Sequence, residues 1–157
     1  MRLVNACEPA FRNLVRGAVL TGCRYSELAG MHAADFNADA GVISVRESKA
    51  GKPRHVVLTD EGQRLFADLT AGKLGSDPIF TRADGGMWRR SHQLRPMREA
   101  CRRAKIKPEI SFHVLRHTHG SALAMRGVPM GVIAEQLGHA DTRMTEKHYA
   151  HLVARFN

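Results

Sequence analysis

The chain has 157 residues, which is enough for one domain with a substantial core but not comfortably for two. Lysine and arginine outnumber aspartate and glutamate by 24 to 15, and the resulting formal charge of +9 predicts a polyanionic partner, first nucleic acid and second an anionic membrane surface. Three widely spaced cysteines without a CxxC pair, no apolar run near the roughly 18 residues of a membrane span, and no secretion signal exclude a disulfide framework, a membrane span and export.

The first predicted elements are two helices separated by Gly22. The longer helix runs from about Glu8 to Thr21 and has apolar residues at helical spacing, namely Phe11, Leu14, Val15, Ala18 and Val19. A short helix follows from Tyr25 to Ala29, with Arg24 near its start and Glu27 three residues later. On spacing alone, this pair is best interpreted as a local ion pair worth about a few tenths of a kcal/mol.

A β-hairpin with a basic tip is predicted next. Apolar alternation at 42–45 and again at 55–58 flanks a glycine- and proline-containing turn at 49–53. Lysines at such a tip are usually solvated or protect a sheet edge. A lysine held above a phosphodiester could instead protonate a departing oxygen. Thr59 then caps a helix predicted from about Asp60 to Ala71.

The segment from Arg82 to Lys107 contains nine basic residues against Asp84 and Glu99. A helix is predicted to begin near Leu94, with these residues facing inward: Leu94, Met97, Cys101 and Ala104. Three basic residues would form one outward stripe: Arg95, Arg98 and Arg102. The charge imbalance favours a contact of this stripe with the DNA backbone about as strongly as it favours an ordinary solvated face.

The stretch SFHVLRHTHG, from Ser111 to Gly120, predicts an anion site at the start of a helix. Ser111 is a suitable N-cap, and the helix is expected to span about 112–126, with apolar residues at Leu115, Ala122 and Met125. His113 and Arg116 would share one face close to the positive end of the helix, where a phosphate is favoured. If the stretch stood alone, a surface arginine beside a core histidine would be the better interpretation.

Two more helices are predicted at the C-terminal end. One begins at Pro129 and ends at Gly138, and His139 follows immediately. Asp141 can cap the last helix, which carries Tyr149. Taken alone, this tyrosine would be a core residue. The predicted elements describe an α+β fold that is mainly α-helical, with a small antiparallel hairpin on one side.

Four short boxes, in this order, resemble the signature of the tyrosine recombinases of the phage integrase family. They are TGCRYSEL at 21–28, SKAG at 48–51, HVLRHT at 113–118, and LGH at 137–139 followed by Tyr149. Each box is weak alone, but their order and spacing across nearly the whole chain are specific. The resemblance implies that residues 1–157 form a recombinase catalytic domain without the N-terminal DNA-clamping domain of the family.

The resemblance also implies a role for each matching residue. Two arginines would stabilise the attacked phosphate, His113 would accept the proton of the nucleophile, His139 would contact the phosphate, Lys49 would be the general acid, and Glu27 would support the arginines. The matching catalytic residues are Arg24, Lys49, His113, Arg116, His139 and Tyr149. Lys52 competes with Lys49 as the acid. His117 is expected to be buried and hydrogen-bonded rather than catalytic.

These residue types suit attack on a DNA phosphodiester. Guanidinium groups can stabilise the added negative charge, and a tyrosine with an ordinary pKa of about 10 needs a positive field or a base to attack at neutral pH. The family chemistry implies a 3′-phosphotyrosyl intermediate and requires no nucleotide or metal cofactor. The expected partner is double-stranded DNA in the cytoplasm of a bacterium or in phage infection, at the nucleoid. The resemblance implies self-association into a tetramer on DNA, whereas this isolated domain is expected to be a monomer.

Three alternatives remain at this point. A type IB topoisomerase would use similar residues to relax DNA. A basic DNA-binding module would form no covalent link to DNA. A metal-dependent nuclease built on His113, His117 and His119 is the third, but no clustered carboxylates accompany these histidines.

Overall fold

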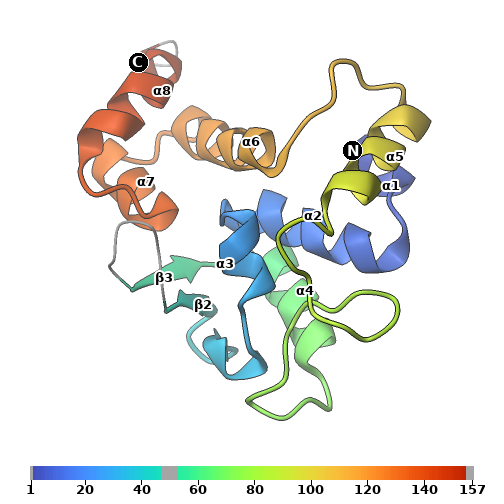
Figure 1. Ribbon diagram of the computed structural model, residues 1–157. Helices are drawn as coiled ribbons and strands as arrows, with labels where there is room; N and C mark the ends of the chain where they lie inside the picture. Colours follow the sequence, from blue (N-terminus) through green and yellow to red (C-terminus); the bar gives the residue numbers. More distant parts are fainter. Residues whose placement is uncertain (1, 47–52, 155–157) are drawn as a thin grey trace.

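The computed structural model describes residues 2–46 and 53–154, and this part of the chain is mainly helical (Figure 1). Eight α-helices, one 3₁₀ turn and a three-stranded antiparallel sheet confirm the predicted α+β class. In chain order the elements are α1 (Arg2–Ala6), α2 (Pro9–Thr21), α3 (Tyr25–Ala29), a 3₁₀ turn (Ala33–Asp35), β1 (Phe36–Asn37), β2 (Val42–Val45), β3 (Arg54–Val57), α4 (Asp60–Thr70), α5 (Leu94–Ala104), α6 (Phe112–Met125), α7 (Met130–Leu137) and α8 (Thr142–Ala154).

The sheet has the strand order β1-β2-β3, and its pleat decides which side chains face the core. Ile43 of β2 is paired with Val56 of β3, and both are fully buried. Arg54 lies two residues before Val56 and therefore shares its inward face, although it is charged. The predicted hairpin is confirmed in its two strands, while its tip at 47–52 lies outside the described residues. Strand β1 was not predicted, because two residues carry no periodic signal.

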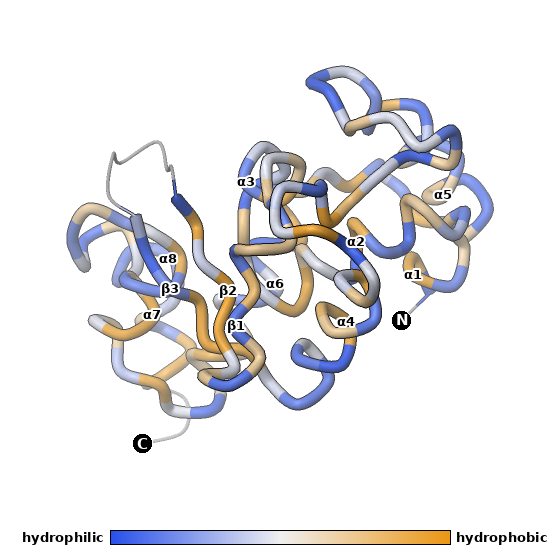
Figure 2. The backbone as a smooth tube through the Cα atoms, turned by 90° about the horizontal axis from the view of Figure 1, so that it is seen from below, coloured by the Kyte–Doolittle hydropathy of each residue, from blue (hydrophilic) through white to orange (hydrophobic). Residues whose placement is uncertain are grey.

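The buried apolar residues form two separate clusters. The larger cluster joins α1 to α5, the sheet and the first turn of α6. The smaller cluster lies between α6, α7 and α8, and its buried members are Ala124, Ile133, Leu137 and Tyr149. In Figure 1 these three helices stand together at one side of the molecule, beside the strands β2 and β3. Figure 2 shows apolar backbone stretches within β2 and β3 and hydrophilic ones along the outer turns.

Two of the three predicted helix caps are present as side-chain hydrogen bonds. The amide of Gly62 donates to Thr59 Oγ1 at 3.2 Å, and the amide of Arg143 donates to Asp141 Oδ1 at 2.9 Å. Ser111 precedes α6 as predicted, but its side chain makes no capping hydrogen bond. The start of α6 is instead determined by the burial of Phe112, which packs edge-on against Phe11.

One predicted inward position is wrong, and two apolar residues of α6 are exposed. Leu94 is 59% exposed, because α5 contacts α1 through the later residues Met97, Ala100 and Cys101. On α6, Ala122 and Met125 are exposed; the buried residues include Leu115 near the start of the helix and Gly120 and Ala124 further along. No helix in the part of the chain that the structure describes combines the length and apolar character that crossing a membrane requires.

Candidate active site

A buried ion pair organises the first wall of the site. Arg54 reaches Glu27 with two parallel hydrogen bonds, Nη1 to Oε2 at 2.7 Å and Nη2 to Oε1 at 2.9 Å. The Arg24 guanidinium lies 3.5 Å from the same carboxylate, and the Arg24 amide donates to Glu27 Oε1 at 2.9 Å. The local Arg24–Glu27 pair predicted from spacing is therefore present, but the principal partner of Glu27 is Arg54.

The electrostatic balance of this pair keeps Glu27 ionised. Burial alone would raise the pKa of Glu27, but the hydrogen bonds from Arg54 and from the Arg24 amide, with the charges of both guanidiniums, hold it below its ordinary value. The carboxylate is therefore saturated by its two arginine partners. The Arg24 side chain keeps part of its surface exposed and remains free to meet an anion.

Arg116 is 5% exposed and bridges two distant parts of the chain. Its Nη1 donates to the carbonyl of Gly22 at 2.8 Å, and its Nη2 donates to the carbonyl of Leu137. Burial, followed by the charge of Arg24, lowers the pKa of Arg116 to about 10, so the guanidinium still carries its charge at neutral pH. Two of the five N–H groups are used by these carbonyls, and the rest are available to a ligand.

Tyr149 is 2% exposed and belongs to the smaller apolar cluster. Tyr149 was expected either as a core residue or as a residue of the site, and the side chain has both features. Its ring packs in the core, while its hydroxyl lies 3.0 Å from His117 Nδ1. Burial raises the pKa of the Tyr149 phenol, and the opposing charge of Arg116 only reduces that effect. The positive field of the site alone therefore does not ionise Tyr149 at neutral pH.

Gly120 makes room for the Tyr149 ring on α6. A Cβ atom at Gly120 would lie 2.5 Å from the Tyr149 hydroxyl oxygen, which is closer than atoms can pack. We expect Gly120→Ala to destabilise the fold by about 1–3 kcal/mol, because the ring must leave its position or the helices must separate. Thermal unfolding followed by circular dichroism measures this loss. Gly131→Ala is the matched control on α7, since a Cβ there meets nothing within 4 Å. Equal stability of the two variants would contradict the close packing.

Two histidines of α6 form a hydrogen-bonded chain that leads to the Tyr149 hydroxyl. His117 Nε2 lies 2.9 Å from His113 Nε2, and the other nitrogen of His117 contacts Tyr149. The resemblance implies that His113 accepts the tyrosine proton, and in this geometry His113 is linked to the Tyr149 hydroxyl through His117. His117 is hydrogen-bonded as predicted, but it is only partly buried and borders the site.

His139 borders the same hollow as Tyr149 and comes directly after α7. Gly138, which ends α7 with a φ of 76°, allows the chain to turn so that His139 follows at once; Arg54 packs against this glycine. His139 Nδ1 lies 2.6 Å from Thr145 Oγ1. Burial, followed by the charges of Arg116 and Arg24, lowers the pKa of His139 to about 4, so its ring is neutral at neutral pH.

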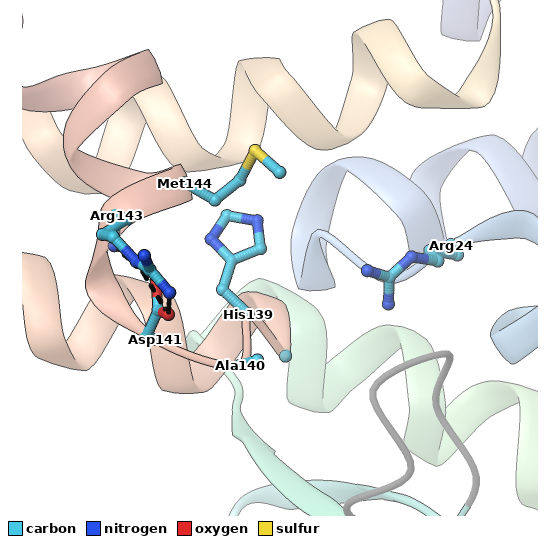
Figure 3. A pocket seen from close by; sticks show the side chains of 7 residues that line it. Arg24, His139, Ala140, Asp141, Arg143 and Met144 are labelled. Atoms are coloured by element: carbon cyan, nitrogen blue, oxygen red, sulfur yellow. Dashed lines mark hydrogen bonds and ion pairs between the residues drawn. The ribbon is translucent and has the colours of Figure 1, made fainter.

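An open hollow of about 580 Å³ collects these side chains. It is bordered by two guanidiniums, three imidazoles and one phenol from the residues discussed above, namely Arg24, Arg116, His113, His117, His139 and Tyr149. None of the described residues that line it is acidic. An adjoining hollow of about 460 Å³ shares Arg24 and His139, and Figure 3 shows these two side chains facing each other across it. The geometry suits a doubly coordinated phosphate.

The remaining predicted residues lie elsewhere or outside the described chain. Lys49 and its competitor Lys52 fall in the range 47–52, which the structure does not describe. The stripe on α5 is exposed as predicted, and two of its members face carboxylates: Arg95 lies 3.3 Å from Glu99 and Arg98 lies 3.7 Å from Glu109. The residues of the stripe are Arg95, Arg98 and Arg102, and they do not line the hollow.

His119 does not join the other two histidines of α6. Its Nδ1 contacts the carbonyl of Val19 at 2.9 Å, so it packs against α2 instead. No group of three or more potential ligands in the described residues could hold a metal ion. The three-histidine nuclease site considered from the sequence is therefore not assembled by α6.

Sequence reasoning missed Arg54 and undervalued His117. The signal for Arg54 was available in the strand pattern, because a residue two positions before a core valine must face inward, and a buried guanidinium needs a carboxylate. No comparable signal existed for His117. Its contact with Tyr149 spans 32 positions in the chain and depends on how α6 and α8 cross.

Comparison with known proteins gives consistent matches. A family model described as "Phage integrase family" matches residues 1–155. The tyrosine recombinase XerA of Saccharolobus solfataricus is 29% identical over 153 residues, which cover 97% of this chain and 50% of that protein. The chain thus spans about half the length of this curated relative.

Solved structures of two such proteins share the fold. A crystal structure of XerA recombinase matches with a TM-score of 0.79 and 26% identity, covering 94% of this chain and 55% of that one. The catalytic domain of bacteriophage HP1 integrase matches with a TM-score of 0.73 and 30% identity, covering 99% of this chain and 89% of that one.

Proposed function

The chain belongs to the phage integrase family, and from this membership we propose that it cleaves and rejoins DNA strands in site-specific recombination. The reaction would proceed through a covalent 3′-phosphotyrosyl intermediate on Tyr149. The observation that supports it best is the shared hollow, which is lined by the guanidiniums of Arg24 and Arg116, the neutral ring of His139 and the phenol of Tyr149.

The arginines are suited to hold the attacked phosphate. In the transition state of phosphoryl transfer, negative charge is spread over the non-bridging oxygens, and preorganised donors stabilise it without moving. Arg116 is immobilised by two backbone carbonyls and Arg24 by Glu27, so neither guanidinium has to be ordered when DNA binds. Arg54 is the supporting residue, since its bonds to Glu27 fix the carboxylate that orients Arg24.

His139 would bind the phosphate as a neutral donor. When Thr145 donates its hydroxyl proton to Nδ1, the proton of the imidazole must lie on Nε2, and that N–H is free to bond a phosphate oxygen. A neutral ring also avoids adding a third positive charge next to Arg24 and Arg116. This agrees with the low pKa of His139, about 4.

The proposed step conserves the phosphodiester bond energy. The Tyr149 oxygen forms a bond to phosphorus while the bond from phosphorus to the 5′-oxygen breaks, and the departing oxygen takes a proton. We assign this proton to Lys49, with Lys52 as the competing donor. A 5′-hydroxyl from a second strand can then attack the phosphotyrosine and rejoin the DNA. Double-stranded DNA is thus the proposed partner, with four protomers assembling on it.

A pool of nicked duplexes with randomised sequence around the nick tests this function, because the target site does not have to be known. A nick close to the cleavage point releases the short fragment that carries the new 5′-hydroxyl. Because this fragment diffuses away, the strand cannot be rejoined and the covalent adduct accumulates. We expect a protein–DNA adduct that survives denaturation, forms in the presence of a chelator, and leaves a free 5′-hydroxyl on the released strand. Sequencing the trapped DNA would give the target site.

Other outcomes distinguish the alternatives. Binding to DNA without any adduct would support a non-catalytic DNA-binding module and overturn the proposal. Efficient relaxation of supercoiled plasmids that lack the selected site would favour a type IB topoisomerase. An adduct that maps to Tyr25, the only other tyrosine, would remove Tyr149 as the nucleophile.

A further inference from the structure

The hydroxyl of Tyr149 is the first member of a chain of three polar groups that ends at the rim of the hollow. The chain runs from Tyr149 to His117 over 3.0 Å and from His117 to His113 over 2.9 Å. His117 is partly buried and His113 is exposed. Both histidines lie on α6 four residues apart, which places the rings one above the other on a single helix face. The two rings meet edge to face, with centroids 4.4 Å apart.

When both rings are neutral, two opposite arrangements of protons satisfy these contacts, and only the one in which the Tyr149 hydroxyl donates allows His117 to take its proton. His117 Nδ1 must be bare to accept from the Tyr149 hydroxyl, so its proton lies on Nε2. That N–H points to His113 Nε2, which must then be the bare nitrogen of its own ring. Every donor in the chain therefore faces an acceptor, and all donors point from Tyr149 toward the exposed end.

On this geometry we propose that His117 is a catalytic residue, the general base that takes the Tyr149 proton, and that His113 relays the charge to the surface of the site. This inference rests on the proposed function. As the tyrosine oxygen bonds to phosphorus, its proton moves to His117 Nδ1, and the proton on His117 Nε2 moves to His113 Nε2. The phenol loses one proton and His113 gains one. The positive charge appears beside the phosphate, where it is stabilising.

The groups around His117 are suited to this role. From α6 it faces His113 and Arg116, and from α8 it faces His148, at a centroid distance of 4.8 Å, and Tyr149. Burial, and then the charges of His113, His148 and Arg116, lower the pKa of His117, so it is a neutral acceptor at neutral pH. The phenol needs such an acceptor, because burial raises the pKa of Tyr149.

The test uses single-turnover cleavage of the selected nicked DNA by His117→Asn. An asparagine oxygen can replace Nδ1 as the hydrogen-bond acceptor for Tyr149 but cannot take its proton. We expect cleavage to slow by about 10²–10⁴-fold, the usual contribution of general base catalysis, with little change in the melting temperature. His151→Asn, at an exposed position on α8, is the matched control and should cleave like the intact chain.

Two further measurements separate a base from a positioning residue. In the intact chain, cleavage should fall at acidic pH as His117 becomes protonated, with a midpoint below that of a free histidine, and His117→Asn should lose this limb. A substrate with sulfur at the bridging 5′ position has a leaving group that needs no proton. This substrate should restore cleavage by a variant that lacks the general acid, but it should not restore cleavage by His117→Asn.

The outcomes distinguish the relay from the function. If the intact chain forms no adduct, the proposed function fails and the relay fails with it. If the intact chain forms the adduct and His117→Asn cleaves at the same rate, keeps the acid limb, or is restored by the sulfur substrate, only the relay is overturned.

Discussion

Tyr149→Phe should bind DNA as tightly as the intact chain does and form no covalent adduct with it. The substitution removes one oxygen atom, which is the proposed nucleophile, from the wall of the hollow. The phenylalanine ring keeps the packing against Ala124, Ile133 and Leu137. Only the bond to His117 is lost, at a cost of about 1 kcal/mol in the free energy of unfolding. Denaturing gels of the nicked-DNA reaction measure the adduct, and mobility-shift titrations measure binding.

Tyr25→Phe is the control for this variant. The Tyr25 hydroxyl also borders the hollow, but it donates to the Arg89 carbonyl at 2.5 Å instead of facing a histidine. Burial raises the pKa of Tyr25 as well, and it has no imidazole partner to take its proton in the described structure. Tyr25→Phe should therefore still form the adduct. An adduct that persists in Tyr149→Phe would remove the assigned nucleophile.

The second large effect is expected for Glu27→Ala, which should lower the free energy of unfolding. Truncating Glu27 leaves the Arg54 guanidinium buried at 7% exposure without its carboxylate, next to Arg24 and Arg116. Breaking a buried ion pair from one side typically costs about 3–5 kcal/mol, because the remaining charge is uncompensated. Urea unfolding at neutral pH measures the difference. Glu61→Ala is the control, since Glu61 is exposed and lies 3.7 Å from Arg16, and it should change stability by less than about 1 kcal/mol.

The pH dependence of stability tests whether the ionised carboxylate of Glu27 is the source of this stabilisation. Its pKa is lower in the folded chain than in the unfolded chain, so its contribution is complete above the unfolded value of about 4.3 and is lost as the pH falls through the folded value. The difference in unfolding free energy between the intact chain and Glu27→Gln should therefore narrow in acid. A gap that stays constant down to the folded pKa would contradict this assignment.

Two buried arginines connect the two halves of the molecule. Arg116 ties the ends of α2 and α7 through the carbonyls of Gly22 and Leu137, and Arg54 donates from β3 to the carbonyl of Gln136 at 3.0 Å. Gln136 adds bonds to the edge of β3, since its side chain accepts from the Val57 amide and donates to the His55 carbonyl. The smaller cluster with Tyr149 is thus held against the sheet by the same charges that form the site.

The sequence alone determined the family and most of the helices, and it named the candidate catalytic residues. Helices with a clear apolar period, a recognisable cap or a terminating glycine were predicted almost to the residue, as α2, α4 and α7 show. Such features act within one or two turns of the chain, so neighbouring residues are sufficient to specify them. The family boxes added Arg24, His139 and Tyr149, which no local pattern would have joined.

Only the tertiary structure decided which of these groups touch. The Glu27–Arg54 pair spans 27 positions and the His117–Tyr149 bond spans 32, and neither distance can be inferred from local spacing. The same applies to burial. Leu94 has the spacing of a core residue but is exposed at the first position of α5, while Arg54 is charged yet buried because the sheet pleat turns it inward. Contacts between distant segments depend on how helices and strands are placed relative to one another, and this placement is set by the packing of the whole chain.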